Sequence, residues 1–455
     1  MDNIKDTSKA DNMELKNKII KNAPYIIFII IACISFYFLI QQFGQNFFEF
    51  DSWMYLINAQ VILSSGHIRT TGLAYGTFAN QTSNRFAPLM PYAMAGLTSI
   101  TSKLFRASLL QTANIYPPLL FILMAAMVFI LFERAYKEKL GDTAKWLGLI
   151  GAILFLSMPV LFQQFTAGMF QEEAFGFFSV IALIATFYIA NKERSYLMAL
   201  LAGIVYVGVL LGSKYFTVIS IIVPFFIFVE ALVLFLKNED LKKFVYLNAI
   251  IVGFATLGNI FLALYHGGFA VSGFSLHGIF IPINLVLLIV ALLFAFLLSI
   301  DWNKLAKRRF ISRLDEKTNN LIITLGIMIL ISIPVLPKII SYGSYLLSFS
   351  VYQGLPLFKT VQEFTPSPVM DMSSYFGVLL GSPYIYFGIL GIFTIMLAYK
   401  LYKHDNDMLG LLLIPAVYPL FYTAMSLAKY IADGSIVLVL VIVYIMAEIL
   451  VKIGG

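Results

Sequence analysis

The 455-residue sequence contains twelve apolar runs long enough to cross a lipid bilayer as helices. Inside a bilayer every backbone N–H and C=O group must be paired within the protein, and a helix does this within a single segment. With 60% hydrophobic and only 12% charged residues, the composition is typical of a membrane protein. We therefore predict an all-α, polytopic protein with spans near 24–43, 113–133, 146–162, 174–190, 196–212, 215–236, 244–263, 279–300, 320–340, 382–402, 408–425 and 431–451.

A thirteenth apolar segment, 86–105, is ambiguous because it contains two prolines, a glycine and many hydroxyl side chains. The distribution of basic residues decides whether this segment crosses the membrane, since Lys and Arg are enriched in cytoplasmic loops. If 86–105 does not cross, most of the 31 Lys and Arg residues, including the loop KLAKRRFISR at 304–313, lie on the side of both termini. We predict twelve spans, with both termini in the cytoplasm and 86–105 as an interfacial or re-entrant helix.

This topology predicts a cytoplasmic segment at 1–23 and a single transmembrane domain over 24–455, with long outer loops at 44–106 and 342–381. Long loops without regular structure are uncommon unless they are functional or disordered. We expect the first loop to contain a helix from Asp51 to Ser65, ended by Gly66. The net charge of +7 is then no indication of a nucleic-acid partner, and the single cysteine excludes an intrachain disulfide.

Three short acidic groups lie in separate outer loops: EFD at 49–51, QEE at 171–173 and TVQE at 360–363. Carboxylates that come together from separate loops repel one another unless a cation lies between them. A hard divalent cation needs such a set of oxygen ligands. The pattern therefore indicates a metal site on the outer face.

Each acidic group also has a simpler structural interpretation. Asp51 could cap the helix that follows it. Glu172 and Glu173 could begin a span, where the helix dipole favours anions. Glu363 could be a solvated loop residue. These alternatives stay open on the residues alone.

The order of three motifs resembles one family of membrane enzymes. FEFDSWMY at 48–55, PVLFQQFTAGMFQEEA at 159–174 and TVQEFTP at 360–366 are similar to the acidic motifs of the oligosaccharyltransferase catalytic subunits, which are glycosyltransferases of the GT-C class. The stretch that begins NIYPPLLFI at 114 also resembles that family's second and third spans. Each motif alone is weak, and their order and loop placement carry the resemblance.

The resemblance implies an enzyme that transfers a glycan from a polyprenyl phosphate or pyrophosphate carrier to an acceptor asparagine. The reaction would take place at the extracytoplasmic face of the cell membrane, with Mg²⁺ or Mn²⁺ as cofactor. A divalent cation neutralises the charge that develops on the phosphate as the sugar leaves. The implied partners are the lipid-linked glycan, an acceptor polypeptide and membrane lipids.

The resemblance assigns the metal site to the first two motifs. Asp51 would be a ligand that also meets the acceptor, and Glu173 would be a second ligand. The family's second motif usually begins with Asp, but this sequence has Gln171 there and an additional acid, Glu172. Gln171 can bind the metal through its carbonyl oxygen but brings no charge. Either Glu172 replaces the usual ligand, or the site binds metal weakly, or the chain is a divergent member of the family.

The remaining roles fall on the late part of the chain. The resemblance implies that Glu363 binds the acceptor amide, with Thr360 in the same acceptor-binding motif. Lys429 would pair with the lipid phosphate where the family usually has Arg. A lysine supplies a point charge there but not the two parallel hydrogen bonds of a guanidinium.

One family feature is missing from this sequence. Typical members carry a soluble domain with a Trp-Trp-Asp signature that reads the acceptor sequence, whereas Trp53, Trp146 and Trp302 are isolated here. Acceptor reading would then come from a separate soluble subunit, be relaxed or be absent, or else the chain is a fragment of a longer protein. This departure also leaves two alternatives open: another GT-C transferase that modifies lipid or protein hydroxyls from a monophosphate carrier, and a transporter or flippase.

Overall fold

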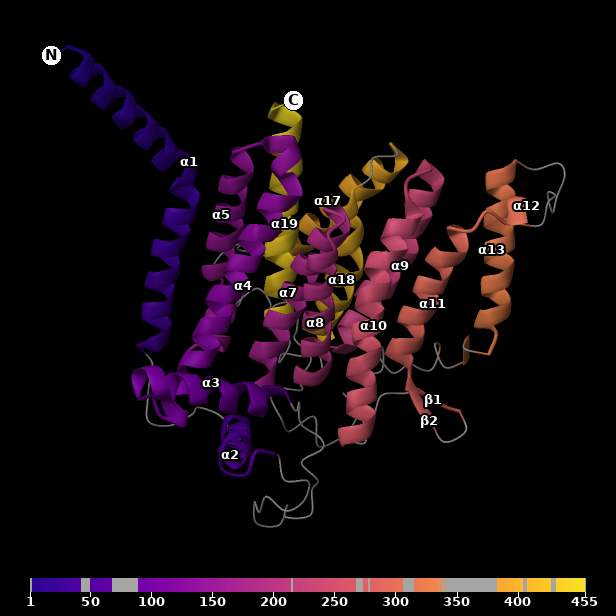
Figure 1. Cartoon of the computed structure of the whole chain (residues 1–455), viewed down its shortest axis with the longest axis horizontal. Coiled ribbons are helices and arrows are strands. Elements are labelled where there is room, and N and C mark those ends of the chain that lie inside the picture. Colours follow the sequence, from indigo (N-terminus) through magenta and orange to yellow (C-terminus); the bar gives the residue numbers. More distant parts are fainter. Residues whose placement is uncertain are drawn as a thin grey trace.

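The computed structural model describes residues 2–41, 50–67, 89–213, 216–266, 273–276, 279–305, 315–334, 336–337, 340, 383–403, 407–426 and 431–454. The fold is all-α and polytopic, as the sequence predicts, apart from one short β-hairpin (Figure 1). In chain order the elements are α1 (Asp2–Ile40), α2 (Phe50–Ser65), α3 (Leu89–Phe105), α4 (Leu109–Leu140), α5 (Thr143–Leu156), α6 (Pro159–Gln164), α7 (Glu172–Lys192), α8 (Tyr196–Gly212), α9 (Phe216–Lys237), α10 (Leu241–His266), β1 (Gly273–Leu276), β2 (Ile279–Pro282), α11 (Ile283–Leu298), α12 (Trp302–Leu305), α13 (Glu316–Ser332), α17 (Pro383–Tyr402), α18 (Met408–Ser426) and α19 (Ile431–Gly454).

Each of the twelve expected apolar runs overlaps one of the longer helices: α1, α4, α5, α7, α8, α9, α10, α11, α13, α17, α18 and α19. Among the described residues, six helical segments are long and apolar enough to cross a membrane: Lys21–Ile40, Leu109–Leu140, Glu173–Lys192, Ile219–Lys237, Leu241–Phe261 and Gly434–Ile453. Shorter apolar helices lie between them. The chain is a multi-pass, helical membrane protein, and the count of twelve spans stays a prediction.

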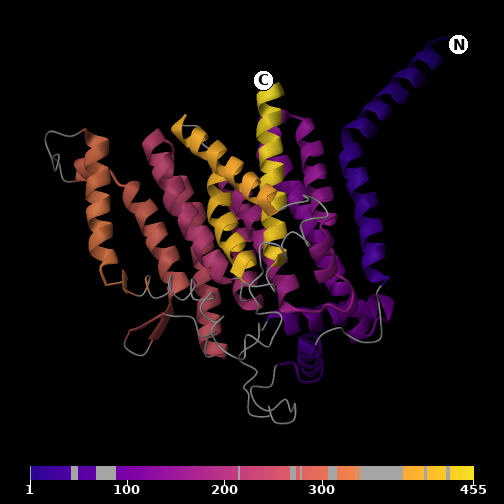
Figure 2. The same cartoon turned by 180° about the vertical axis from the view of Figure 1, so that it is seen from behind.

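The bundle has two different ends (Figures 1 and 2). Both termini lie at one end, which we call the termini end, while α2, α3 and the β-hairpin lie at the opposite, loop end. Helix α3 runs across the ends of the upright helices rather than parallel to them. That the segment 86–105 does not cross the membrane stays a prediction.

Two expected spans differ from the prediction in the kind of structure that they contain. The run at 146–162 is two helices, because α5 ends at Leu156 and α6 begins at Pro159. Met158 between them has an extended backbone, φ −71° and ψ 113°. A proline disfavours the helical conformation of the residue before it, so the helix cannot continue through Met158.

The run at 279–300 begins with a strand rather than a helix. Strand β2 pairs antiparallel with β1, with Gly273 opposite Pro282 and Leu276 opposite Ile279. Pro282 then forms the N-cap of α11, so the helix starts at Ile283. The sequence prediction contained no strands, and this hairpin is a correction to it.

Helix α7 lies at the centre of the bundle and α1 at its edge. Within the apolar segment of α7, 89% of the residues are buried, against 17% for α1, so α1 turns most of its surface to the surrounding lipid. Helix α4 packs closely on α5. At Gly148 in α5 an added Cβ would lie 2.6 Å from the carbonyl oxygen of Phe129. Small residues at helix contacts permit this close approach in membrane proteins.

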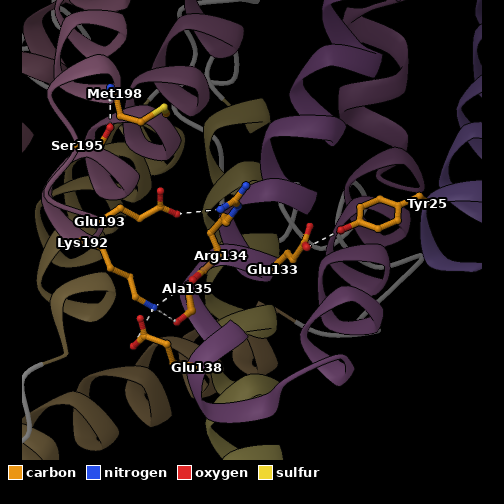
Figure 3. A network of polar contacts seen from close by, with 9 residues as sticks. All are labelled: Tyr25, Glu133, Arg134, Ala135, Glu138, Lys192, Glu193, Ser195 and Met198. Atoms are coloured by element: carbon orange, nitrogen blue, oxygen red, sulfur yellow. Dashed lines mark hydrogen bonds and ion pairs between the residues drawn. The ribbon is translucent and has the colours of Figure 1, made fainter. Parts of the chain in front are cut away.

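A polar network ties three helices together at the termini end (Figure 3). The Tyr25 hydroxyl of α1 donates to Glu133 Oε1 of α4 at 2.5 Å. Arg134 Nη1 pairs with Glu193 Oε1, just after α7, at 3.1 Å. Lys192 Nζ donates to the carbonyl oxygen of Ala135 at 2.8 Å. The last turns of α4 and α7 are therefore linked by both side chains and backbone.

A second network at the same end is buried. Lys400 Nζ of α17 lies 2.8 Å from Asp407 Oδ2 and 2.6 Å from Glu448 Oε2 of α19. The Tyr136 hydroxyl of α4 donates to Glu448 Oε1 at 2.8 Å, and the Tyr444 hydroxyl donates to Asp407. These contacts fix α17 and the start of α18 against α4 and α19.

Candidate active site at the loop end

The first acidic motif lies at the start of α2. One stripe of this helix is buried: Ser52, Tyr55, Ala59 and Ile62, at helical spacing of three and four residues. This stripe packs α2 against α3 and α4. The helix ends at Ser65, and Gly66 follows with a φ of +79° that favours glycine. The predicted helix over Asp51 to Ser65 is confirmed, and Asp51 lies in its first turn.

The second acidic motif follows a tight turn between α6 and α7. The Met169 N–H donates to the carbonyl oxygen of Thr166 at 3.1 Å, and Gly168 has a φ of +98°. Glycine adopts this conformation without the steric strain of a Cβ atom. The Ala167 N–H also donates to the carbonyl oxygen of Leu39 at 3.2 Å, near the end of α1. The TAGM sequence thus forms a turn, attached to α1, that leads the chain into α7.

Three aromatic side chains join the two motifs. The fully buried ring of Phe170 lies edge-to-face against Tyr55 of α2, with 6.0 Å between ring centroids. It makes the same kind of contact with Tyr116 of α4 at 5.6 Å. Edge-to-face pairs at these distances add about 0.5–1.5 kcal/mol each to the burial of their area. We call Tyr55, Tyr116 and Phe170 the Phe170 cluster.

The Phe170 cluster places the acidic segments beside each other. Asp51 lies one helical turn before Tyr55, and Gln171 directly follows Phe170. The first turn of α2 and the first turn of α7 are therefore held at the same end of the bundle by one aromatic contact. A cation site shared by the two motifs stays a prediction.

The residues of the second motif begin α7. Gln171 is the N-cap, with an extended backbone of φ −126° and ψ 162°, and its side chain is buried. Glu172 and Glu173 occupy the first turn, and Glu173 is half-buried. The positive end of the helix dipole stabilises carboxylates here, with or without a bound cation. The simpler interpretation of these acids is thus compatible with the metal-binding one.

The oxygen donors of Asp51, Gln171, Glu172 and Glu173 suit a hard divalent cation such as Mg²⁺ or Mn²⁺ better than a thiolate-seeking metal. Among the residues whose side chains are described, no group of three or more His, Cys, Asp or Glu is gathered for a metal ion. The side chains of Asp51 and Glu172 are not among them. The ligand set therefore stays a prediction that the chemistry of the donors supports.

The other expected site residues lie outside the described part of the chain. Thr360 and Glu363 belong to the loop 342–381, none of which is described, and Lys429 follows α18. Their roles in binding the acceptor and the lipid phosphate stay predictions.

Sequence reasoning missed the contacts that position the site. Two features of the sequence hint at these contacts: the aromatic residue directly before QEE, and the spacing of four residues between Asp51 and Tyr55. Such a spacing puts both residues on one face of a helix. Aromatic pairing between distant segments cannot be assigned from one sequence, because many other aromatic residues are available in it.

The family model for oligosaccharyl transferase STT3, N-terminal, matches residues 20–366, which is most of the chain. The chain belongs to the STT3 oligosaccharyltransferase family. It is 23% identical over 422 residues to dolichyl-phosphooligosaccharide-protein glycotransferase 1 of Pyrococcus horikoshii, covering 88% of this chain and 39% of that protein. The resemblance stated from the three motifs is confirmed at the level of the family.

Solved structures of the oligosaccharyltransferase AglB from Archaeoglobus fulgidus share the fold of this STT3 family chain. The complex with an inhibitory peptide and a dolichol-phosphate superposes with a TM-score of 0.69 at 18% identity, over 96% of this chain and 52% of that one. The complex with Zn and sulfate has a TM-score of 0.60 at 17% identity, over 93% and 49%. This chain thus spans about half the length of that enzyme, and less of the curated relative.

Proposed function

We propose that this protein transfers a glycan from a polyprenyl phosphate or pyrophosphate carrier to asparagine side chains of acceptor proteins. The observation that carries the proposal is the Phe170 cluster, which joins the two acidic motifs at one end of an STT3 family chain. Family membership favours this reaction over transport and over transfer to hydroxyl groups. The transmembrane helices over 24–455 would act as one GT-C domain.

In the proposed site, Asp51 and Glu173 hold Mg²⁺ or Mn²⁺, with Glu172 or Gln171 completing the ligand set. When bound, the cation neutralises charge on the phosphate of the leaving lipid carrier. Asp51 also accepts a hydrogen bond from the acceptor amide. The burial of Gln171 beside the aromatic contacts keeps the second motif in a fixed position when substrate enters.

The late motifs act on the two substrates. Glu363 accepts a hydrogen bond from the acceptor amide nitrogen, with Thr360 beside it in the same motif, and Lys429 pairs with the lipid phosphate. The Archaeoglobus complexes with a peptide and a dolichol-phosphate, and with Zn and sulfate, support a peptide, a lipid phosphate and a divalent cation as ligands of this fold. The use of Mg²⁺ or Mn²⁺ by this chain is part of the proposal.

The proposed orientation puts both termini in the cytoplasm and the loop end outside. It rests on the basic loops, which gather at the side of the termini. Cysteines introduced at Gly72 and Ser367, in a background with Cys33 replaced by Ser, should react with a membrane-impermeant reagent in intact cells. A cysteine at Ala306 should react only after lysis. Labelling of Ala306→Cys in intact cells would show that the protein has the orientation opposite to the proposed one.

The function is tested by a transfer assay with the purified chain, a polyprenyl-linked glycan and two peptides that differ only in Asn or Gln at the acceptor position. The expected product is a glycopeptide from the Asn peptide alone. The Gln peptide is the matched control because it keeps the amide and adds one methylene. Transfer to a peptide whose only acceptors are Ser and Thr hydroxyls would contradict this proposal and would show that the enzyme modifies hydroxyl groups instead.

A further inference from the structure

A cavity of about 430 Å³ lies at the termini end, between α4, α17 and α19, far from the acidic motifs. Its walls are apolar and come from Ile395 and Met396 of α17 and Val451 of α19. Ile395 is 71% exposed although it lies in the middle of an apolar helix. Water has few polar partners along such apolar walls, so a lipid chain suits this part of the cavity better than water does.

The rim of this cavity is basic. Lys139 from the last turn of α4, Lys403 after α17 and Lys452 near the end of α19 all line it and are exposed. In the described part of the chain, none of the three forms an ion pair. The ammonium groups of Lys403 and Lys452 lie 5.9 and 5.6 Å from the ring centroid of Tyr399, another lining residue. Two of the three cations therefore gather around one side chain.

The acid in the lining does not neutralise these lysines. Glu448 also borders the cavity, but its carboxylate is held by Lys400 Nζ at 2.6 Å and by the Tyr136 hydroxyl at 2.8 Å. Lys400 in turn also pairs with Asp407. The buried network holds one ammonium and two carboxylates, and the three lysines of the rim outnumber its one excess negative charge, so the charge that the cavity presents to an incoming ligand is positive.

We propose that this cavity binds an anionic phospholipid, with the phosphate among Lys139, Lys403 and Lys452 and one acyl chain along the apolar walls. A basic pocket between membrane helices on the cytoplasmic side is a known setting for anionic headgroups, because anionic lipids are concentrated in that leaflet. Tyr399 lies where an aromatic ring is expected at the interface between headgroups and hydrocarbon. The proposal rests on the proposed orientation, which puts this end of the bundle in the cytoplasm. It is independent of glycan transfer, since its residues lie at the end opposite the acidic motifs.

The test is native mass spectrometry of the purified full chain in detergent, with equal concentrations of phosphatidylglycerol and phosphatidylcholine added. The unmodified chain should bind phosphatidylglycerol in preference. Each lysine near a headgroup contributes about a fivefold factor in affinity, so Lys403→Gln with Lys452→Gln should reduce phosphatidylglycerol binding by at least about tenfold. Binding of phosphatidylcholine should change little.

The matched control is Lys137→Gln with Lys242→Gln, which removes two exposed lysines at the same end but outside the cavity lining. It should leave the preference for phosphatidylglycerol unchanged. A third variant, Met396→Trp, should fill the apolar part of the cavity and reduce binding of both lipids. Equal binding of the two lipids by the unmodified chain, or an equal loss in the control pair, would overturn the proposal.

Discussion

The two ends of the bundle use carboxylates in different ways. At the termini end, Glu133, Glu193, Asp407 and Glu448 are paired with side chains of other helices, and these pairs connect the helices. At the loop end, the segments that carry Asp51 and Gln171–Glu173 are positioned by the aromatic contacts of Phe170 and by the backbone bond from Ala167 to Leu39.

The paired carboxylates of the termini end are structural, whereas those of the loop end are the ones that we propose to take part in chemistry. A buried carboxylate that is paired across helices is costly to disrupt, because the partner charge is left unpaired. A site whose backbone is fixed by apolar contacts keeps its geometry when a carboxylate is removed. Changes at the termini end should therefore affect stability first, and changes at the loop end should affect activity first.

The largest effect is expected from Asp51→Ala. Loss of the residue that we propose to bind both the metal and the acceptor should lower the transfer rate at least about a hundredfold, because the charge on the leaving phosphate would no longer be neutralised. The melting temperature in detergent should stay close to that of the unmodified chain. Ser64→Ala, an exposed change at the other end of α2, is the control and should be fully active. A large fall in the melting temperature of Asp51→Ala would contradict the view that carboxylates at the loop end are not needed for stability.

The second effect concerns stability at the termini end. Lys400→Ala removes the cation between two buried carboxylates, Asp407 and Glu448, and should destabilise the fold by about 3–5 kcal/mol. Thermal or denaturant unfolding in detergent measures this loss. The transfer rate per folded molecule should change far less than in Asp51→Ala. Unchanged stability would show that this network does not hold α17 and α19 together.

Phe170→Leu is expected to affect both properties moderately. It removes the edge-to-face contacts with Tyr55 and Tyr116 while keeping an apolar side chain, and should cost about 1–2 kcal/mol of stability. Because the two acidic segments would then be less well fixed, the transfer rate should fall by about tenfold. Full activity would show that the Phe170 cluster does not position the site.

The smallest effect is expected from Asp142→Asn, in the connection between α4 and α5. Its hydrogen bond with Lys145, together with the charge of Lys21, lowers the pKa of the Asp142 carboxyl below its ordinary value. A lowered folded-state pKa adds stability above the unfolded pKa of about 3.9, and this is lost as the pH falls through the folded value. Since the group is exposed, the melting temperature at neutral pH should not change measurably. A clear fall would place this pair among the structural contacts of the termini end.

The fold class followed from the sequence because the apolar runs are long and separated by charged or turn-forming residues. The helix from Asp51 to Ser65 and its end at Gly66 were also predictable from local chemistry. The helix break before Pro159 could have been predicted from the proline. The hairpin over 273–282 could not, since short apolar strands resemble the start of a helix in sequence.

For the candidate site, the sequence predicted the acidic motifs but not the contacts that position them. The types and order of the acidic residues indicated the chemistry, but which contacts bring them together depends on tertiary packing of Phe170 with Tyr55 and Tyr116. The paired carboxylates at the termini end were likewise not recognisable, because Lys400 and Glu448 come together only when α17 packs on α19. Their spacing in the sequence carries no such signal.

The most direct test of the loop end as a metal-dependent transfer site is the rate of glycan transfer by the purified chain after treatment with a chelator. The expected result is loss of transfer to an Asn peptide and recovery on addition of Mn²⁺ or Mg²⁺. Asp51→Ala should show no recovery at the same metal concentration. Full activity of the unmodified chain in excess chelator would contradict the proposed role of Asp51 and Gln171–Glu173.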